Sequence, residues 1–249
     1  MPDSDDFIPA VVPTQSNAQA MLRNFIQAVL GPAVDVVAAQ QNRVPEPRTP
    51  DFVVMTPIRY TRLATNLDQY QDARFFGSIL GTTLTITSLS FGTVGIGSTI
   101  FGVGVLGGTT VTALGPGPGR WLVTPIQQVA NELMAAGRQT YMQSGELVVQ
   151  LDFHSASTSD AGDMARTVST LFRDEFATTQ FANQVPSYDV TPLHADDAKQ
   201  MPFINENQQF EWRWVVEARV QTNDVVTLPQ QYAESLHVNL ISVQAAYGP

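Results

Sequence analysis

The chain has 249 residues, of which 43% are hydrophobic and 14% are charged, and its formal net charge is −10. This composition permits a large hydrophobic core and excludes a disordered chain, whereas the acidic balance disfavours tight non-specific binding to nucleic acid. Cysteine is absent, which excludes disulfides, thiolate nucleophiles and zinc–thiolate sites.

The N-terminal segment, residues 1–14, contains three prolines and is predicted to be an extended arm. Its acidic start lacks the basic residues and the apolar run of a signal peptide. No apolar stretch approaches the length of a membrane span. We therefore expect no membrane contact, and a protein that is made in the cytosol and either stays there or is built into a particle there.

The first regular element is predicted as a helix near Gln15–Leu30, capped by Thr14 or Ser16 and ended by Gly31. Its apolar residues recur with helical spacing, at Ala18, Met21, Leu22, Phe25, Ile26 and Val29. The following segment, Ala33–Ala39, fits either a short strand or a helical turn.

An extended loop is predicted at Gln40–Pro50, because three prolines there exclude regular structure. Phe52–Leu63 then has the composition of a strand. Proline lacks the N–H that a central strand needs, so Pro57 marks an edge or a bulge.

The composition changes abruptly at Phe75–Gly119, which contains most of the glycines and no acidic residue, basic residue or histidine. Short Thr-rich apolar runs separated by glycine turns predict strands there. These runs are Thr82–Leu89, Gly97–Phe101 and Thr109–Leu114. We predict a discontinuous host domain, residues 1–74 and 120–249, with an inserted β-module at 75–119. Charge-free strands aggregate when exposed, so the module is expected to pack against its host or a neighbouring subunit.

The host domain is predicted to resume with a helix that starts at Thr124 and ends at Gly137, followed by a strand at Gly145–His154. A helix then begins near Ser159, with an apolar face at Met164, Val168, Leu171, Phe172 and Phe176. The last predicted elements are a short strand near Tyr188–Leu193, a helix from Pro229 through Leu236 and a strand at Val238–Val243.

The most regular pattern lies at Gln209–Gln221, where apolar and polar side chains alternate. A strand turns successive side chains to opposite faces, so we predict a core strand with one apolar face. The other face carries charges of both signs, at Glu211, Arg213, Glu217 and Arg219. Two interpretations remain open: a solvated face with cross-strand ion pairs, or a contact surface for another subunit. The predicted fold is α+β, a mostly antiparallel sheet flanked by helices, with a small all-β insertion.

Three groups of residues have a superficial likeness to chemical sites. The glycines of Gly102–Gly107 have the spacing of a dinucleotide loop, but a strand-like segment follows them where a helix is required. Asp152, His154 and Ser155 are residue types of a hydrolytic triad without a nucleophile turn. His194 precedes two aspartates, fewer convergent ligands than a metal site needs. We predict no catalytic, cofactor or metal site, and no enzyme.

Several strings in the host domain resemble one family. They are Gln40–Pro47, Asp51–Ile58, Leu171–Glu175, Gln200–Trp214 and Val226–Ala233. From about residue 15 onward the chain is similar to the neck or tail terminator proteins of tailed bacteriophages. The Gly/Thr-rich module is similar to small β-modules that recur in phage virion proteins.

The resemblance implies a tail-terminator-like fold and a structural, non-enzymatic protein of the virion, assembled in the host cytoplasm. Terminators form a ring, usually a hexamer, that ends the tail tube and joins the head connector or stopper proteins. DNA passes through the lumen without specific binding. The alternatives are another virion structural role, as a connector stopper or a surface-decorating subunit, and a small-molecule enzyme or carrier.

Overall fold

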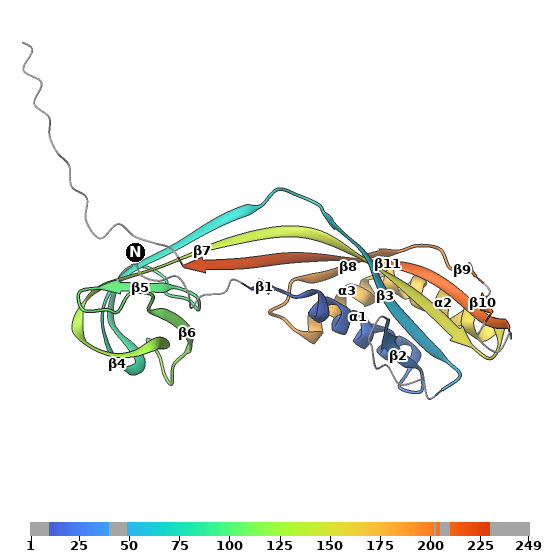
Figure 1. Cartoon of the computed structure of the whole chain (residues 1–249), viewed down its shortest axis with the longest axis horizontal. Coiled ribbons are helices and arrows are strands. Elements are labelled where there is room, and N and C mark those ends of the chain that lie inside the picture. The colour runs from blue at the N-terminus through green and yellow to red at the C-terminus, as the bar shows by residue number, and fades with distance from the viewer. Residues whose placement is uncertain (1–9, 40–48, 202, 205–209, 230–249) are drawn as a thin grey trace, which may run out of the picture. The chain divides into compact units, whose positions relative to one another are not determined.

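The computed structural model describes residues 10–39, 49–201, 203–204 and 210–229 (Figure 1). The chain forms two compact units. Unit 1 contains Tyr70–Gln139, and unit 2 contains Thr140–Thr227 together with the described residues before Tyr70. Three long strands, β4 (Leu67–Gly92), β7 (Arg120–Ser155) and β11 (Phe210–Pro229), have residues in both units. The predicted insertion of residues 75–119 into a host domain stays a prediction, since unit 1 also contains 70–74 and 120–139.

The predicted α+β fold with helices flanking a mostly antiparallel sheet is wrong. Of the described residues, 57% lie in strands and 20% in helices, and the sheet is mixed. One cause is the segment after Thr124, predicted as a helix, which is instead part of β7. Met134–Gly137 pairs there with β5 (Thr99–Gly102), so tertiary pairing overrides a helix-like spacing of apolar residues.

Unit 2 is built on a sheet in which β11 (Phe210–Pro229), β7 and β3 (Phe52–Arg62) are neighbours. The segment Ala33–Ala39 contains a strand, β2 (Asp35–Ala38), and β2 pairs with β3 in parallel. Along its other edge, β11 pairs with β1 (Val11–Val12), β8 (Val190–Ala195), β9 (Lys199–Gln200) and β10 (Phe203–Ile204). The predicted bulge in β3 is confirmed by a register shift between Pro57 and Arg59.

Three helices of the described residues belong to unit 2 and lie on one side of these strands (Figure 1). The predicted first helix is confirmed as α1 (Gln15–Leu30), with Thr14 and Asn17 capping each other and Gly31 ending it. The helix near Ser159 is α2 (Thr158–Phe172), but it stops before Phe176. That residue belongs to α3 (Glu175–Gln184), which begins after the N-cap Asp174.

The core of unit 2 lies between the helices and the sheet. Phe25, Phe172 and Phe181 pack with ring centroids 5.5 to 6.1 Å apart, one ring from each helix. Apolar residues of β3, β7 and β11 complete this core, among them Met55, Leu151 and Val216. Burial of each such side chain contributes roughly 1.5–3 kcal/mol of gross stabilising free energy. The helices therefore cover the face of the sheet that carries these side chains.

Unit 1 has a separate core of its own, formed by β4, β5, β6 (Thr110–Leu114) and the first part of β7. Two of the three predicted strands of the module are confirmed to within two residues, as β5 and β6, whereas the first, Thr82–Leu89, lies within the longer strand β4. β4 folds back on itself at Gly81, which has a φ of 66°, and Thr87 Oγ1 donates to the carbonyl of Phe76. Gly92 is required where the hairpin ends, because a Cβ there would overlap the carbonyl of Asp72.

Several predictions fall outside the described residues. These are the first nine residues of the arm, most of the loop Gln40–Pro50, the helix after Pro229 and the strand Val238–Val243. In the part of the chain that is described, no helix is long and apolar enough to cross a membrane.

Candidate subunit-contact surface

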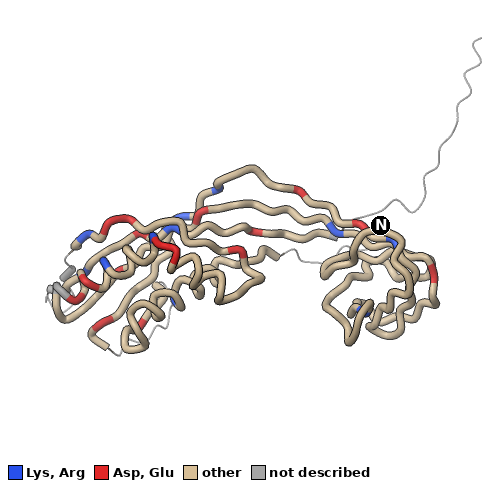
Figure 2. Tube along the Cα trace, turned by 180° about the vertical axis from the view of Figure 1, so that it is seen from behind, with Lys and Arg blue, Asp and Glu red and all other residues tan. Residues whose placement is uncertain are grey.

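The four charged residues predicted as a contact surface all belong to β11, and three of them have described side chains. Arg213, Glu217 and Arg219 alternate with Val216 and Ala218, which are buried against the helices. The charged residues therefore face away from the helices. Glu211 lies opposite Phe203 of β10, and its side chain is outside the described part of the chain. Figure 2 shows basic and acidic residues spread along the strands of this unit.

Arg213 pairs with Asp152 of the neighbouring strand β7. Its Nε and Nη2 atoms donate to Oδ1 of Asp152 at 3.0 and 2.7 Å, and the residue Asp152 is only 6% exposed. Gln150 donates from Nε2 to both carboxylate oxygens, at 2.9 and 3.1 Å. A buried carboxylate needs such partners because desolvation otherwise disfavours its charged form. Arg213 and Asp152 are thus an internal link between two strands.

Arg219 lies among three acidic side chains. Its guanidinium nitrogens are 3.2 Å from Glu146, 3.5 Å from Asp196 and 3.8 Å from Glu217. Burial lowers the pKa of Arg219, but the charge of Asp196 and the hydrogen bond to Glu146 outweigh it, and the pKa lies above its usual value. Arg59 of β3 is 3.7 Å from the same Glu146, so the network reaches across three neighbouring strands.

We call the side of the sheet that carries these pairs the charged face, with Arg59, Glu146, Asp152, Arg213, Glu217 and Arg219 as its members. Val148 and Val215 are buried on this same side, beneath the charged side chains. The sequence left two interpretations of this face open. The first was a solvated face with cross-strand ion pairs, and the structure contains such pairs. The second, contact with another subunit, stays a prediction.

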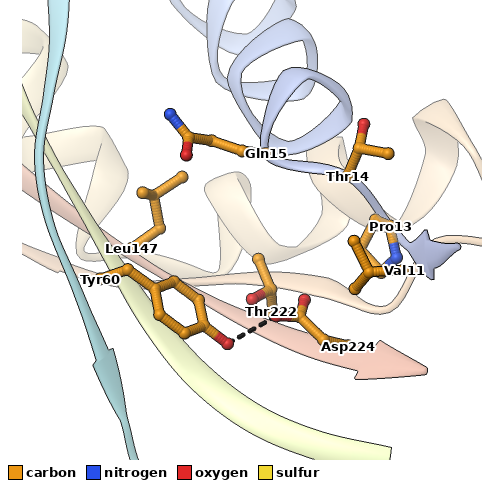
Figure 3. A pocket seen from close by; sticks show the side chains of 8 residues that line it. All are labelled: Val11, Pro13, Thr14, Gln15, Tyr60, Leu147, Thr222 and Asp224. Atoms are coloured by element: carbon orange, nitrogen blue, oxygen red, sulfur yellow. Dashed lines mark hydrogen bonds between the residues drawn. The ribbon is translucent and has the colours of Figure 1, made fainter. Parts of the chain in front are cut away.

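A cleft on the opposite, helix-covered side was not foreseen from the sequence (Figure 3). Its volume is about 210 Å³, and it is lined by Val11, Pro13, Thr14, Gln15, Tyr60, Leu147, Thr222 and Asp224. The Tyr60 hydroxyl donates to Asp224 Oδ2 at 2.5 Å. Burial and this bond to a carboxylate raise the pKa of Tyr60, since both disfavour the phenolate.

One signal in the sequence could have found this cleft. The alternation that runs from Trp214 to Val220 continues by the same two-residue period to Thr222 and Asp224. It therefore puts a hydroxyl and a carboxylate on the apolar side of the strand, and a polar side chain at such a position calls for a local partner. Tyr60 had no comparable signal, because the bulge near Pro57 changes the parity of its strand.

The other candidate groups are not brought together into reactive sites. Asp152 pairs with Arg213, His154 stacks on Phe52 with ring centroids 4.5 Å apart, and Ser155 donates to Asp51 at 2.6 Å. The glycines of Gly102–Gly107 form the turn between β5 and β6.

The potential metal ligands near His194 are also dispersed. His194 is 3.6 Å from Asp196, whereas Asp197 pairs with Arg173 at 3.0 Å. Among the described residues, no group of three or more acidic or histidine side chains has the arrangement of a metal site.

The comparisons with known proteins give one family. The model of the family described as phage neck terminator protein matches residues 109–245, more than half of the chain. The matched segment includes all of β7 to β11, and therefore two of the three strands that carry the charged face. No curated protein matches the chain.

Proposed function

The chain belongs to the phage neck terminator family, and we propose that it forms a ring that caps the tail tube and joins it to the head connector. As a member of this family it is a structural protein of the virion neck that interacts with other tail and head proteins. In the proposal the ring is a homo-hexamer assembled in the host cytoplasm, and DNA passes through its lumen without specific binding.

The charged face is the observation that supports a contact between subunits. Its arginines are held in fixed positions by cross-strand acids, and Glu217 and Arg59 remain partly exposed at its margin. Charges in fixed positions set the register and orientation of a protein–protein contact more than they add affinity. A face with both signs of charge suits a neighbour that presents the complementary pattern.

The proposed mechanism is surface complementarity without chemistry. One side of the ring matches the last layer of the tube, and the other side presents a different surface, so that no further tube subunit adds. The net charge of −10 agrees with a lumen through which DNA slides, because an acidic wall does not bind phosphates.

The decisive experiment measures the assembly of the purified chain by native mass spectrometry and negative-stain imaging. We expect a closed ring with six copies, which binds one end of isolated tail tubes and stops the addition of tube subunits. A compact monomer at high concentration that leaves tube growth unchanged would contradict the proposal.

A second candidate is another virion structural role, as a connector stopper or a surface-decorating subunit. It is favoured by exposed apolar side chains in unit 1, among them Leu80, Val103 and Ile126. Deletion of residues 75–119 separates the two candidates. A terminator without this segment still closes its ring, whereas a decorating subunit loses its attachment to the virion.

A further inference from the structure

Among the described residues, the carboxylate of Asp224 has a hydrogen-bond donor but no cationic partner. Tyr60 donates to its Oδ2 atom, while Oδ1 has no donor among the described residues. Within the same part of the chain no basic side chain forms an ion pair with Asp224. Its side chain lies in a cleft whose other walls include Val11, Pro13 and Leu147 (Figure 3). A half-buried carboxylate in apolar surroundings gains most from a cationic partner.

Thr222 is a second polar group in the cleft that has no side-chain hydrogen-bond partner in the described part of the chain. The residue is 4% exposed, and its Oγ1 atom makes no hydrogen bond with the described residues. The nearby hydroxyl of Thr222 lowers the pKa of Tyr60, but the positions of the two hydroxyl groups do not meet the criteria for a hydrogen bond. A buried hydroxyl without a partner is costly, so two separate polar groups of one cleft are open to the same ligand.

The end of α1 does not supply the missing partner. Thr14 and Gln15 border the cleft at the start of this helix, but Thr14 Oγ1 accepts from the amide of Asn17, and the Asn17 side chain accepts from the amide of Thr14. These bonds use both groups internally.

A guanidinium group fits the chemistry of this cleft better than an ammonium group. Its N–H donors are fixed in a planar fork, which allows one to reach Asp224 Oδ1 while another reaches Thr222 Oγ1. The flat cation stacks on a ring such as that of Tyr60, and the aliphatic stem of arginine packs on apolar walls. We propose that the cleft receives an arginine side chain from a second copy of the chain.

The chain itself carries suitable arginines. Arg74 and Arg120, both in unit 1, are exposed, and neither forms an ion pair with a described acidic side chain. A head-to-tail contact requires two different, complementary surfaces on one chain, and repetition of that contact closes a ring when the rotation allows it. An arginine on one copy and the Asp224 cleft on the next meet this requirement. The inference rests on the proposed ring function, to which it adds a specific contact.

The first test removes the charge of Asp224 in the full-length chain. Asp224→Asn is expected to raise the concentration for half-maximal ring assembly at least about tenfold, because it removes the anion that the arginine pairs with. Asp189→Asn is the control, because it changes an acid outside the cleft that accepts from Asn223. This variant should assemble within about threefold of the unchanged chain. Sedimentation velocity measures both variants, and normal assembly of Asp224→Asn overturns the inference.

The second test identifies the arginine by charge exchange. Asp224→Arg should abolish ring assembly, and combining it with Arg74→Asp or with Arg120→Asp should restore assembly in one of the two double variants. Failure of both combinations, together with normal assembly of both single arginine variants, shows that a second copy does not supply the arginine and overturns the inference.

The two proposals fail in different ways. Rings that form normally with Asp224→Asn leave the terminator function intact and remove only the cleft contact. If the unchanged chain forms no ring, the proposed function fails, and the cleft is then tested on the monomer with N-acetylarginine amide. Chemical-shift changes at Tyr60 and Thr222 that vanish in Asp224→Asn support arginine recognition, and their absence from the unchanged chain overturns it.

Discussion

Tyr60 of β3 reaches across β7 to Asp224 of β11, and its hydroxyl oxygen lies 2.5 Å from the carboxylate oxygen Oδ2. The two residues are 164 positions apart in the chain. The strand between them leaves room because it has a glycine, Gly145, where the ring passes. The side chain of Tyr60 thus links β3 to β11 across the intervening strand β7, next to the cleft.

Gly145 should not tolerate a side chain. A Cβ at this position would overlap the ring of Tyr60, and the overlap involves ring atoms as well as the hydroxyl. We expect Gly145→Ala to lower the free energy of unfolding of unit 2 by about 1–3 kcal/mol, measured by urea denaturation with tryptophan fluorescence. Tyr60→Ser should recover part of the loss in the double variant, whereas Tyr60→Phe should not. Equal stability of Gly145→Ala and the unchanged chain would contradict the observed ring position.

The Tyr60–Asp224 bond should be visible in the pH dependence of stability. The pKa of Tyr60 is raised above its unfolded value of about 10, so the folded state holds the proton more tightly. The contribution of Tyr60 is therefore fully present below that unfolded pKa and is lost as the pH rises through the folded pKa.

Tyr60→Phe isolates this contribution. At neutral pH it should cost at most about 1 kcal/mol, because the residue Tyr60 is 47% exposed. The difference between the two proteins should shrink as the pH rises above about 10. Tyr70→Phe is the control, because the Tyr70 hydroxyl accepts from Gln139 and has no acidic hydrogen-bond partner in the described residues. A difference that grows above pH 10 would contradict the prediction.

Arg213 and Asp152 should behave as a coupled buried pair. Arg213→Met leaves Asp152, a residue that is 6% exposed, with Gln150 as its one side-chain donor among the described residues, and should cost about 3 kcal/mol of unfolding free energy. The double variant Arg213→Met with Asp152→Leu should be closer to the unchanged chain than Arg213→Met alone, because no charge is left unpaired.

An exposed ion pair provides the comparison for this double-mutant cycle. Arg166 pairs with Asp163 on the surface of α2, and Arg166→Met should cost no more than about 1 kcal/mol. Additive losses in the Arg213–Asp152 cycle would show that the two side chains are not energetically linked.

The charged face is tested as a subunit contact by Arg213→Glu and Arg219→Glu, which should both weaken ring assembly. Each of these substitutions also breaks internal pairs, so Arg59→Glu is the sharper variant. Arg59 is exposed, and its one ion pair with the described residues is a 3.7 Å contact with Glu146. Arg59→Glu should leave the unfolding midpoint nearly unchanged while it raises the concentration needed for assembly. Unchanged ring formation by all three variants, in native mass spectra, would show the face to be merely solvated.

The sequence alone determined those features whose cause is local. Helical spacing with a capping residue defines α1 to the residue. Two-residue alternation predicted β11 as far as Gln221 and the side on which Arg213 and Arg219 lie, although the strand continues to Pro229. Glycine turns predict the short strands of unit 1. The strings that resemble neck terminators gave the family, which the match over residues 109–245 confirms.

Only the tertiary structure decided the features that depend on pairing between distant segments. The residues after Thr124 have a helix-like apolar spacing, yet they belong to a strand, because β5 pairs with Met134–Gly137 and supplies backbone hydrogen-bond partners there. Likewise Asp152 is the partner of Arg213, and Tyr60 the partner of Asp224, only because β3, β7 and β11 are neighbours. Local periodicity determines on which face of the sheet a side chain lies. Which strand becomes its neighbour depends on burial and hydrogen bonding across the whole fold.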